Sequence, residues 1–341
     1  MVKHNKLITA NGQPQFGVFK DPVREINYQD YDYHSVMDRR ATAIEKHFHF
    51  NQFQFLGVTN EDIVLGCALV DIKYLGNAFI YLFDRNTQHI DEYSYLQPLG
   101  FNTSLSIQPD GGTSHFKKGK NRFQLTASEC PRERNLRVNL GKSIKVNITI
   151  SEPENYQPLA VCTQNGYSGW AYTQKAPALN VTGDIEWKDK HIRLDQNTTL
   201  GSYDWSCGYM RRETAWNWAS LSGFLENGHR IGFNFASGVN ETGYTENGIW
   251  VDNRLYKVGQ IRFIYDRKDR YGQWKIQSCD GSVDLRFEAE GERSEKLNAV
   301  LLASNFTQLF GRFYGDIKLT NGKTITLNGQ PGFAEDHYAK W

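Results

Sequence analysis

The feature that most constrains this fold is an alternation of apolar and polar residues that recurs along the chain. In segments 146–150, 231–235 and 283–287, valine, isoleucine, leucine or phenylalanine occupies every second position. Because successive side chains of a β-strand point to opposite faces, this period of two predicts half-buried strands. Short strands at this density, together with 30 glycines, favour an antiparallel sandwich or barrel. We therefore predict an all-β fold with little helix.

Turn signals separate the predicted strands. Asn321-Gly322 supplies the positive φ angles of a type I′ hairpin turn. Lys188-Asp189 and Asp252-Asn253 indicate two further hairpins. One short helix is expected over residues 38–46, followed by a strand-like run over 47–56.

The distribution of tryptophan divides the chain into two parts. All eight tryptophans lie at or after Trp170, and residues 151–158, which hold two of the nine prolines, are typical of a connection. A length of 341 residues suits about two domains. We expect two tandem antiparallel β-barrels, over residues 1–155 and 156–341, with the tryptophan-rich candidate site in the second. A barrel of about eight strands leaves an interior that suits one small ligand.

Charge and cysteine content exclude several classes of protein. Lysine and arginine number 39 against 38 aspartates and glutamates, so the chain lacks the basic excess of a nucleic-acid-binding protein. No apolar run has the length of a signal peptide or a membrane helix. The five cysteines are odd in number and contain no Cys-x-x-Cys pair, which favours free thiols in a reducing compartment. We expect a cytoplasmic protein with no transmembrane segment.

Known cofactor motifs are missing from the sequence. No glycine-rich loop has the spacing of a dinucleotide or nucleoside triphosphate site. His47 and His49 place two imidazoles close together, but no third ligand follows at a recognisable spacing. We expect neither a metal nor an organic cofactor.

The densest chemistry lies in residues 204–220. Trp216 and Trp218 share one face of a predicted strand, and Asp204, Arg211 and Arg212 add charge around them. A carboxyl group beside tryptophan in a dry pocket has a raised pKa and can act as a general acid, while the ring faces stabilise a developing cation. The alternative is a core of aromatic residues sealed by a structural Asp–Arg pair.

Further candidate residues come from two neighbouring segments. Glu246 is a candidate second carboxylate for acid–base chemistry, with Asn247 beside it as a ligand contact. Trp170 and Tyr172 point the same way along a predicted strand, and we include them with Tyr209 among the ligand-binding candidates. The alternatives are an ordinary polar loop for the first pair and core packing for the three aromatic residues.

The last polar motif is Glu335-Asp336-His337, which places carboxylates next to an imidazole. The alternative interpretation is a solvated tail. The sequence assigns no role to Glu335 or His337.

Several of these motifs also carry a family resemblance. They read LGCALVD (65–71, within 57–83), GWAYTQK (169–175), DWS (204–206), WNWAS (216–220), TEN (245–247) and FAEDH (333–337). Together they resemble the bacterial family catalogued as domain of unknown function 2804, over roughly residues 7–341. That family is distantly similar to tandem lipocalin-like proteins of the calycin type, which include carotenoid 1,2-hydratases, lipocalin-like Diels–Alderases and a fungal lipid-handling survival factor. The resemblance implies two lipocalin-like barrels and a hydrophobic ligand in a barrel or inter-barrel cavity.

Three functions remain open at this point. The first is a cofactor-independent hydratase, isomerase or cyclase that acts on a hydrophobic small molecule, in which Asp204 donates a proton and Glu246 orients water. The second is a non-catalytic carrier of a lipid or isoprenoid, with Arg211 or Arg212 recognising an anionic head group. The third is a glycan-active enzyme that uses tryptophan platforms and paired carboxylates.

Overall fold

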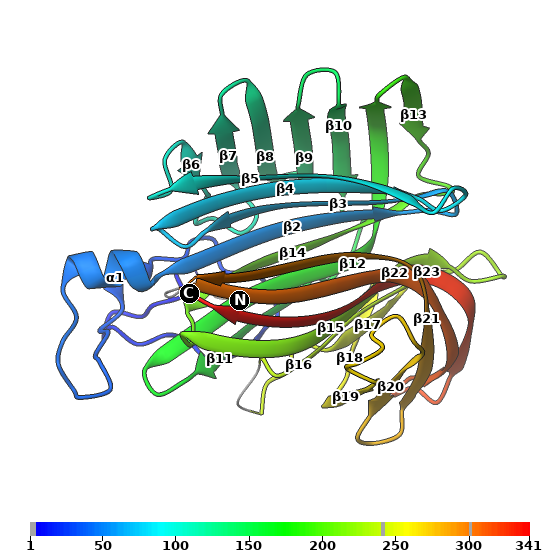
Figure 1. Cartoon of the computed structure of the whole chain (residues 1–341). Helices are drawn as coiled ribbons and strands as arrows, with labels where there is room; N and C mark the ends of the chain where they lie inside the picture. The colour runs from blue at the N-terminus through cyan, green and yellow to red at the C-terminus, as the bar shows by residue number, and fades with distance from the viewer. Residues whose placement is uncertain (1–4, 240–242, 300–301) are drawn as a thin grey trace.

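Two antiparallel β-sheets face each other in the computed structural model, which describes residues 5–239, 243–299 and 302–341. Figure 1 shows strands β2 to β5 in one layer and β15, β22 and β23 in the layer that faces it. Every pair of named strands is antiparallel, and the helical content of the described residues is small. The all-β prediction is confirmed.

The first sheet curls into a nearly closed barrel, in which β3 and β4 pass close to β7. Its main path runs through β5 (His89–Pro98), β4 (Leu75–Asp84), β3 (Ile63–Asp71), β2 (Asn51–Thr59), β14 (Leu200–Tyr209), β12 (Gly169–Trp187), β10 (Ile144–Ser151), β9 (Arg132–Asn139), β8 (Asn121–Glu129), β7 (Gly112–Lys118) and β6 (Thr103–Ser104). Beside this path, β1 (Gly17–Phe19) pairs with β11 (Leu159–Asn165), while β11 and β13 (Lys190–Leu194) pair with β12.

The second sheet forms a half-barrel. Its order is β18 (Arg254–Lys257), β17 (Gly248–Val251), β16 (Arg230–Ser237), β15 (Glu213–Phe224), β23 (Thr324–Lys340), β22 (Leu302–Lys318), β21 (Val283–Ala299), β20 (Trp274–Ser278) and β19 (Ile261–Ile264). The chain therefore passes from the first sheet to the second between Tyr209 and Glu213. Strands β12 and β14, which follow residue 155, are hydrogen-bonded into the first sheet.

Three buried clusters stabilise this arrangement, one inside each sheet's curve and one between the sheets. The alternating segments behave as predicted: the apolar residues of 146–150 lie in the first cluster, and those of 231–235 and 283–287 lie in the second. Between the sheets, the rings of Phe55 and Trp218 pack edge to face with their centroids 6.0 Å apart. Such a pair adds about 0.5–1.5 kcal/mol beyond the area it buries, so aromatic packing joins the two sheets directly.

The predicted hairpins are confirmed, and the predicted helix is displaced. Strands β12 and β13, β17 and β18, and β22 and β23 pair across the three expected turns. The helix α1 covers Ala43–His49 rather than 38–46, because Thr42 and Glu45 form a capping box that begins it there. The strand expected from residue 47 therefore begins at Asn51, and His47 and His49 lie on the helix. A 3-10 turn covers Tyr28–Asp30.

Candidate functional site

A cavity of about 350 Å³ lies between the two sheets. The first sheet lines it with side chains of β2, β3, β4, β12 and β14, and the second sheet lines it with β15, β21, β22 and β23. Most of its surface is apolar, and Phe53, Phe55, Phe79, Trp216 and Trp218 form much of the aromatic wall. Ligand pockets in proteins have volumes of about 300–1,000 Å³ with a few polar groups placed in an apolar wall, and this cavity fits that description.

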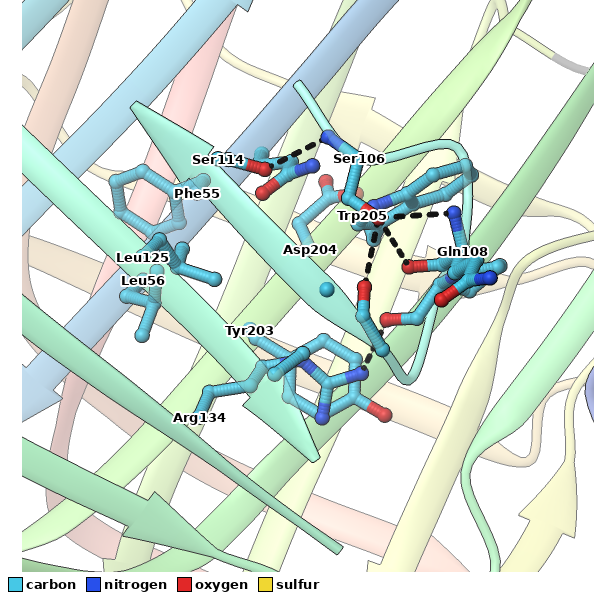
Figure 2. A pocket seen from close by; sticks show the side chains of 15 residues that line it. Phe55, Leu56, Ser106, Gln108, Ser114, Leu125, Arg134, Tyr203, Asp204 and Trp205 are labelled. Atoms are coloured by element: carbon cyan, nitrogen blue, oxygen red, sulfur yellow. Dashed lines mark hydrogen bonds between the residues drawn. The ribbon is translucent and has the colours of Figure 1, made fainter. Parts of the chain in front are cut away.

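The hollow inside the first barrel is far smaller, at about 10 Å³. Figure 2 shows Arg134 lying against Tyr203 beside this hollow, and the guanidinium carbon is 3.3 Å from the centre of the ring. Arg134 also donates to Asp110 at 2.6 Å and lies 3.5 Å from Glu152. Because charged and aromatic side chains fill this part of the barrel, the inter-sheet cavity is the better candidate for a ligand.

Strand alternation sends polar residues of the first sheet into the inter-sheet cavity. On β14, Tyr203 and Trp205 belong to the core of the first barrel, so Asp204 and Ser206 point to the opposite side. Lys175 of β12 is the direct cross-strand neighbour of Asp204. This register places an ammonium group against a carboxylate on the cavity wall.

Lys175, Asp204 and Glu246 form a charged group that we call the acid–base trio. The ammonium group of Lys175 makes an ion pair with Asp204 and lies 3.7 Å from the Oε2 atom of Glu246. The three side chains are only 5%, 14% and 8% exposed. The second carboxylate oxygen of Asp204 accepts a hydrogen bond from the Ser206 hydroxyl at 2.9 Å. The trio therefore contains two carboxyl groups and one cation with little access to water.

The backbone around Glu246 is fixed by three hydrogen bonds. The ammonium group of Lys257 donates to the carbonyl oxygens of Thr245 at 2.5 Å and Asn247 at 2.8 Å. The Asn234 amide donates to the carbonyl oxygen of Glu246 at 2.8 Å. Although Glu246 lies between β16 and β17 rather than on a strand, these bonds hold its side chain against the cavity.

Burial and charge shift the pKa values of two trio members. Burial raises the pKa of Glu246, and the ammonium group of Lys175 opposes that rise only in part. Burial alone would lower the pKa of Lys175, but the carboxylates of Asp204 and Glu246 outweigh burial and raise it. Lys175 therefore remains a cation at neutral pH, and Glu246 is the carboxyl group whose proton is retained to higher pH than usual.

Four predicted site residues meet at this cavity. Asp204, Glu246, Trp216 and Trp218 all line it, although they come from β14, β15 and the β16–β17 connection. The Trp218 indole donates to Asn234 at 2.8 Å, which is the same amide that holds the Glu246 backbone. The structure thus brings both predicted carboxylates and two predicted tryptophans together.

The three aromatic candidates of the first barrel lie elsewhere. Trp170, Tyr172 and Tyr209 are buried in the core cluster of that barrel. Trp170 packs edge to face on Tyr209 with centroids 5.7 Å apart, and the Tyr172 hydroxyl accepts from the backbone of Val23. Their contacts agree with the alternative interpretation of core packing.

The remaining candidates have contacts outside the cavity. The Arg211 guanidinium donates to the Gly238 carbonyl oxygen at 2.8 Å, and Arg212 is exposed. The buried Asn247 side chain accepts from the Ala236 backbone and donates to the Gly259 carbonyl oxygen, both at 2.7 Å. Asn247 therefore supports the backbone next to Glu246.

The residues 335–337 do not form a solvated tail. They lie on β23, and both Glu335 and Asp336 are buried. Glu335 and His337 line the cavity, whereas Asp336 makes an ion pair with Arg270 at 2.8 Å. The solvated-tail alternative is wrong because β15 and β22 pair with β23 on either side.

Lys175 and Arg293 are among the cavity residues that were not predicted from the sequence. Lys175 was part of a quoted motif, and its signal was a lysine inside an otherwise buried strand. Arg293 lines the cavity from β21, makes an ion pair with Glu92 at 2.7 Å, and lies over the Phe79 ring at 4.1 Å. The residues on either side of Arg293 on β21 are polar and exposed, so the sequence around it does not indicate that its side chain is buried against the other sheet.

Two negative findings hold for the described residues. Within residues 5–239, 243–299 and 302–341, no group of three or more histidine, cysteine, aspartate or glutamate side chains is placed to hold a metal ion. None of the helices in this part of the chain is long and apolar enough to cross a membrane.

Comparisons with known proteins agree with this architecture. The crystal structure of CghA with Sch210972 matches with a TM-score of 0.58 at 9% identity, over 96% of this chain and 99% of that chain. A second crystal structure of CghA gives 0.56 at 10% identity, over 96% and 98% of the two chains. Kievitone hydratase from Nectria haematococca gives 0.49 at 11% identity, over 85% and 88%. The two CghA similarities show a shared fold of tandem lipocalin-like barrels.

Sequence comparison identifies the family itself. No curated protein matches the chain. The family model described as "Domain of unknown function (DUF2804)" matches residues 1–341. The chain therefore belongs to the DUF2804 family.

Proposed function

We propose that this protein binds a hydrophobic or amphipathic small molecule in the inter-sheet cavity and catalyses its hydration, isomerisation or cyclisation by acid–base chemistry without a cofactor. The observation that carries the proposal is the position of Lys175, whose ammonium group contacts Asp204 and lies 3.7 Å from Glu246 on the wall of a largely aromatic cavity. A cavity that only stores an apolar ligand has no need for three buried ionisable groups.

Glu246 is the proton donor in this proposal. Asp204 accepts hydrogen bonds from Lys175 and Ser206, so we assign it the proton-accepting role, which reverses the two roles expected from the sequence. Glu246 has the raised pKa that a general acid needs near neutral pH. After donation, the new Glu246 carboxylate is stabilised by the ammonium group of Lys175, and Asp204 is the base that receives a proton from water or substrate. Lys175, which contacts both carboxyl groups, then gives a proton to Glu246 and takes one from Asp204, which restores the starting state.

The tryptophans supply the second part of the proposed mechanism. Protonation of an alkene or an epoxide creates positive charge on carbon. The faces of aromatic rings attract such a charge by about 0.5–2 kcal/mol or more when the site is dry. Trp216 and Trp218 line the same cavity as the trio, so a substrate cation would form beside them.

The fold comparison supports a small-molecule ligand. CghA, which has a similar fold, was crystallised with Sch210972. The mostly apolar wall also weakens the glycan alternative, since sugars need an open polar cleft. A carrier of an apolar molecule is the second candidate, because the aromatic wall alone is sufficient for binding.

The test begins with the purified protein. Native mass spectrometry and solvent extraction identify any co-purifying molecule, and related polyenes, isoprenoids and epoxides are then screened for turnover. The matched variants are Glu246→Gln and the control Glu186→Gln, a surface carboxylate that pairs with Lys145 on the first barrel. We expect Glu246→Gln to lower turnover by about 100-fold or more with little change in affinity, and Glu186→Gln to behave as wild type. Equal turnover in Glu246→Gln and wild type refutes the catalytic proposal; binding without turnover of any screened compound favours the carrier.

A further inference from the structure

A second cluster of polar side chains lies on the part of the cavity wall that the second sheet forms. The hydroxyl of Ser304 on β22 is 3.1 Å from the Nε2 atom of His337 on β23. The Nδ1 atom of the same imidazole is 3.6 Å from the Oε1 atom of Glu335. Ser304, His337 and Glu335 all line the inter-sheet cavity. Hydroxyl, imidazole and carboxylate therefore follow one another in the order of a serine nucleophile, its base and the group that orients the base.

The carboxylate of this group is held in place by neighbours. Glu335 accepts a hydrogen bond from the Trp216 indole at 3.0 Å and another from the Gln308 amide at 2.9 Å. The Gln308 carbonyl oxygen in turn accepts from the Tyr81 hydroxyl at 2.5 Å. Because these donors come from β4, β15 and β22, both sheets fix the position of Glu335.

The imidazole is also fixed. The Trp216 ring lies 4.2 Å from the His337 ring, centroid to centroid, and the Phe306 ring lies 4.9 Å away, edge to face. Two aromatic neighbours restrict rotation of the imidazole, which keeps Nε2 at 3.1 Å from the Ser304 hydroxyl, while Nδ1 lies 3.6 Å from Glu335, an ion-pair distance rather than a hydrogen bond. A base that is oriented before the reaction loses little entropy when it acts.

Ser304 is accessible to a ligand. Its side chain is partly buried, and it borders both the inter-sheet cavity and an adjoining open hollow that also includes Lys340. An acyl chain in the apolar cavity would therefore place a carbonyl group at its polar end near this hydroxyl. Lys340 lines the same two hollows, and its ammonium group pairs with Glu213 at 3.2 Å.

We propose that Ser304, His337 and Glu335 form a second catalytic site, a serine nucleophile with its base and orienting carboxylate, which cleaves esters of apolar acids. Ser304 Oγ bonds to the carbonyl carbon while His337 takes the hydroxyl proton. The carbon–oxygen bond to the leaving alcohol then breaks, and His337 gives that proton to the departing oxygen. Water attacks the acyl-serine ester, its proton passes through His337 to Ser304 Oγ, and the free acid leaves. The site uses none of the acid–base trio.

The test uses the full chain and a fluorophosphonate that carries a long alkyl chain. In this reaction a Ser304 Oγ–phosphorus bond forms, the phosphorus–fluorine bond breaks, and fluoride and a proton are released. We expect one adduct per chain by intact mass, placed on Ser304 by peptide mapping. Ser304→Ala should remove the adduct. The matched control Ser294→Ala changes an exposed serine on the neighbouring strand β21 and should leave labelling unchanged.

Two further variants separate catalysis from simple exposure of a hydroxyl. His337→Gln should slow labelling by about 100-fold or more, because the base is lost. Glu335→Gln should slow it less and shift its pH profile, since Glu335 acts through the imidazole. Wild-type protein that gains no adduct, an adduct on another residue, or equal labelling rates in wild type and His337→Gln would each overturn the proposal. Turnover by the trio is measured on different substrates, so the two proposals fail independently.

Discussion

Lys175→Met removes the ammonium group that contacts the two carboxyl groups of the acid–base trio. At an effective dielectric constant of about 20, a pair of opposite charges 4 Å apart attracts by about 4 kcal/mol, and Lys175 lies 3.7 Å from Glu246 and closer to Asp204. Loss of one partner of a buried pair typically costs about 3–5 kcal/mol. We expect a loss of this size in the free energy of unfolding at pH 7, measured by urea titration with tryptophan fluorescence.

The pH dependence of this loss checks its cause. Without Lys175, the rise that burial causes in the pKa of Glu246 is no longer opposed by the ammonium group, so the folded variant binds more protons than the unfolded chain. The destabilisation should therefore shrink as the pH falls from 7 towards 4.5. Lys145→Met is the control, because its pair with Glu186 is solvent-exposed, and its stability should match wild type. Equal stability of Lys175→Met and wild type at pH 7 would refute the reasoning.

Three further changes test other parts of the structure. Glu246→Gln removes a carboxyl group whose folded pKa is raised above 4.5. Wild type should therefore lose stability relative to this variant as the pH rises from 4.5. The urea midpoint of wild type minus that of the variant should fall over this range. Gly66→Ala places a Cβ atom 2.2 Å from the Tyr81 ring, and we expect thermal unfolding to show a loss of about 1–3 kcal/mol. Arg134→Met removes the guanidinium that pairs with the partly buried Asp110 at 2.6 Å. Because Arg132 still pairs with Glu152 at 3.1 Å, we expect a loss of about 3 kcal/mol in urea. If Gly66→Ala is as stable as wild type, the packing described around Tyr81 is contradicted. If Arg134→Met is as stable as wild type, the ion pair described is contradicted.

The sheets were largely predictable because their signals are local. Alternation over 146–150 and turn dipeptides such as Asn321-Gly322 specify strands and hairpins within a few residues of themselves. The helix was misplaced because its first residue is set by the capping box between Thr42 and Glu45. This box outweighed the helix preference of the residues from 38 onwards. The partners of a strand are harder to predict, since β14 and β2 pair across about 150 residues of chain.

The site was predictable only in part for the same reason. Asp204 and Glu246 could be chosen as polar residues near tryptophan, but their common partner Lys175 comes from another strand and is identified by the register of β12 against β14. Trp170 looks like Trp218 in the sequence, yet it faces the interior of the first barrel. Which face of a strand meets the other sheet is a tertiary property, and no local pattern distinguishes an interior from an interface.

The position of the cavity between two sheets links ligand binding to assembly of the whole molecule. Neither sheet encloses the space alone, since side chains of both line it. A ligand present at 100 times its dissociation constant adds about 2.7 kcal/mol to the stability of the state that binds it, and here that state is the joined pair of sheets. By the same linkage, a change in the aromatic contacts that lowers the population of the joined state lowers the apparent affinity, even at residues that never touch the ligand.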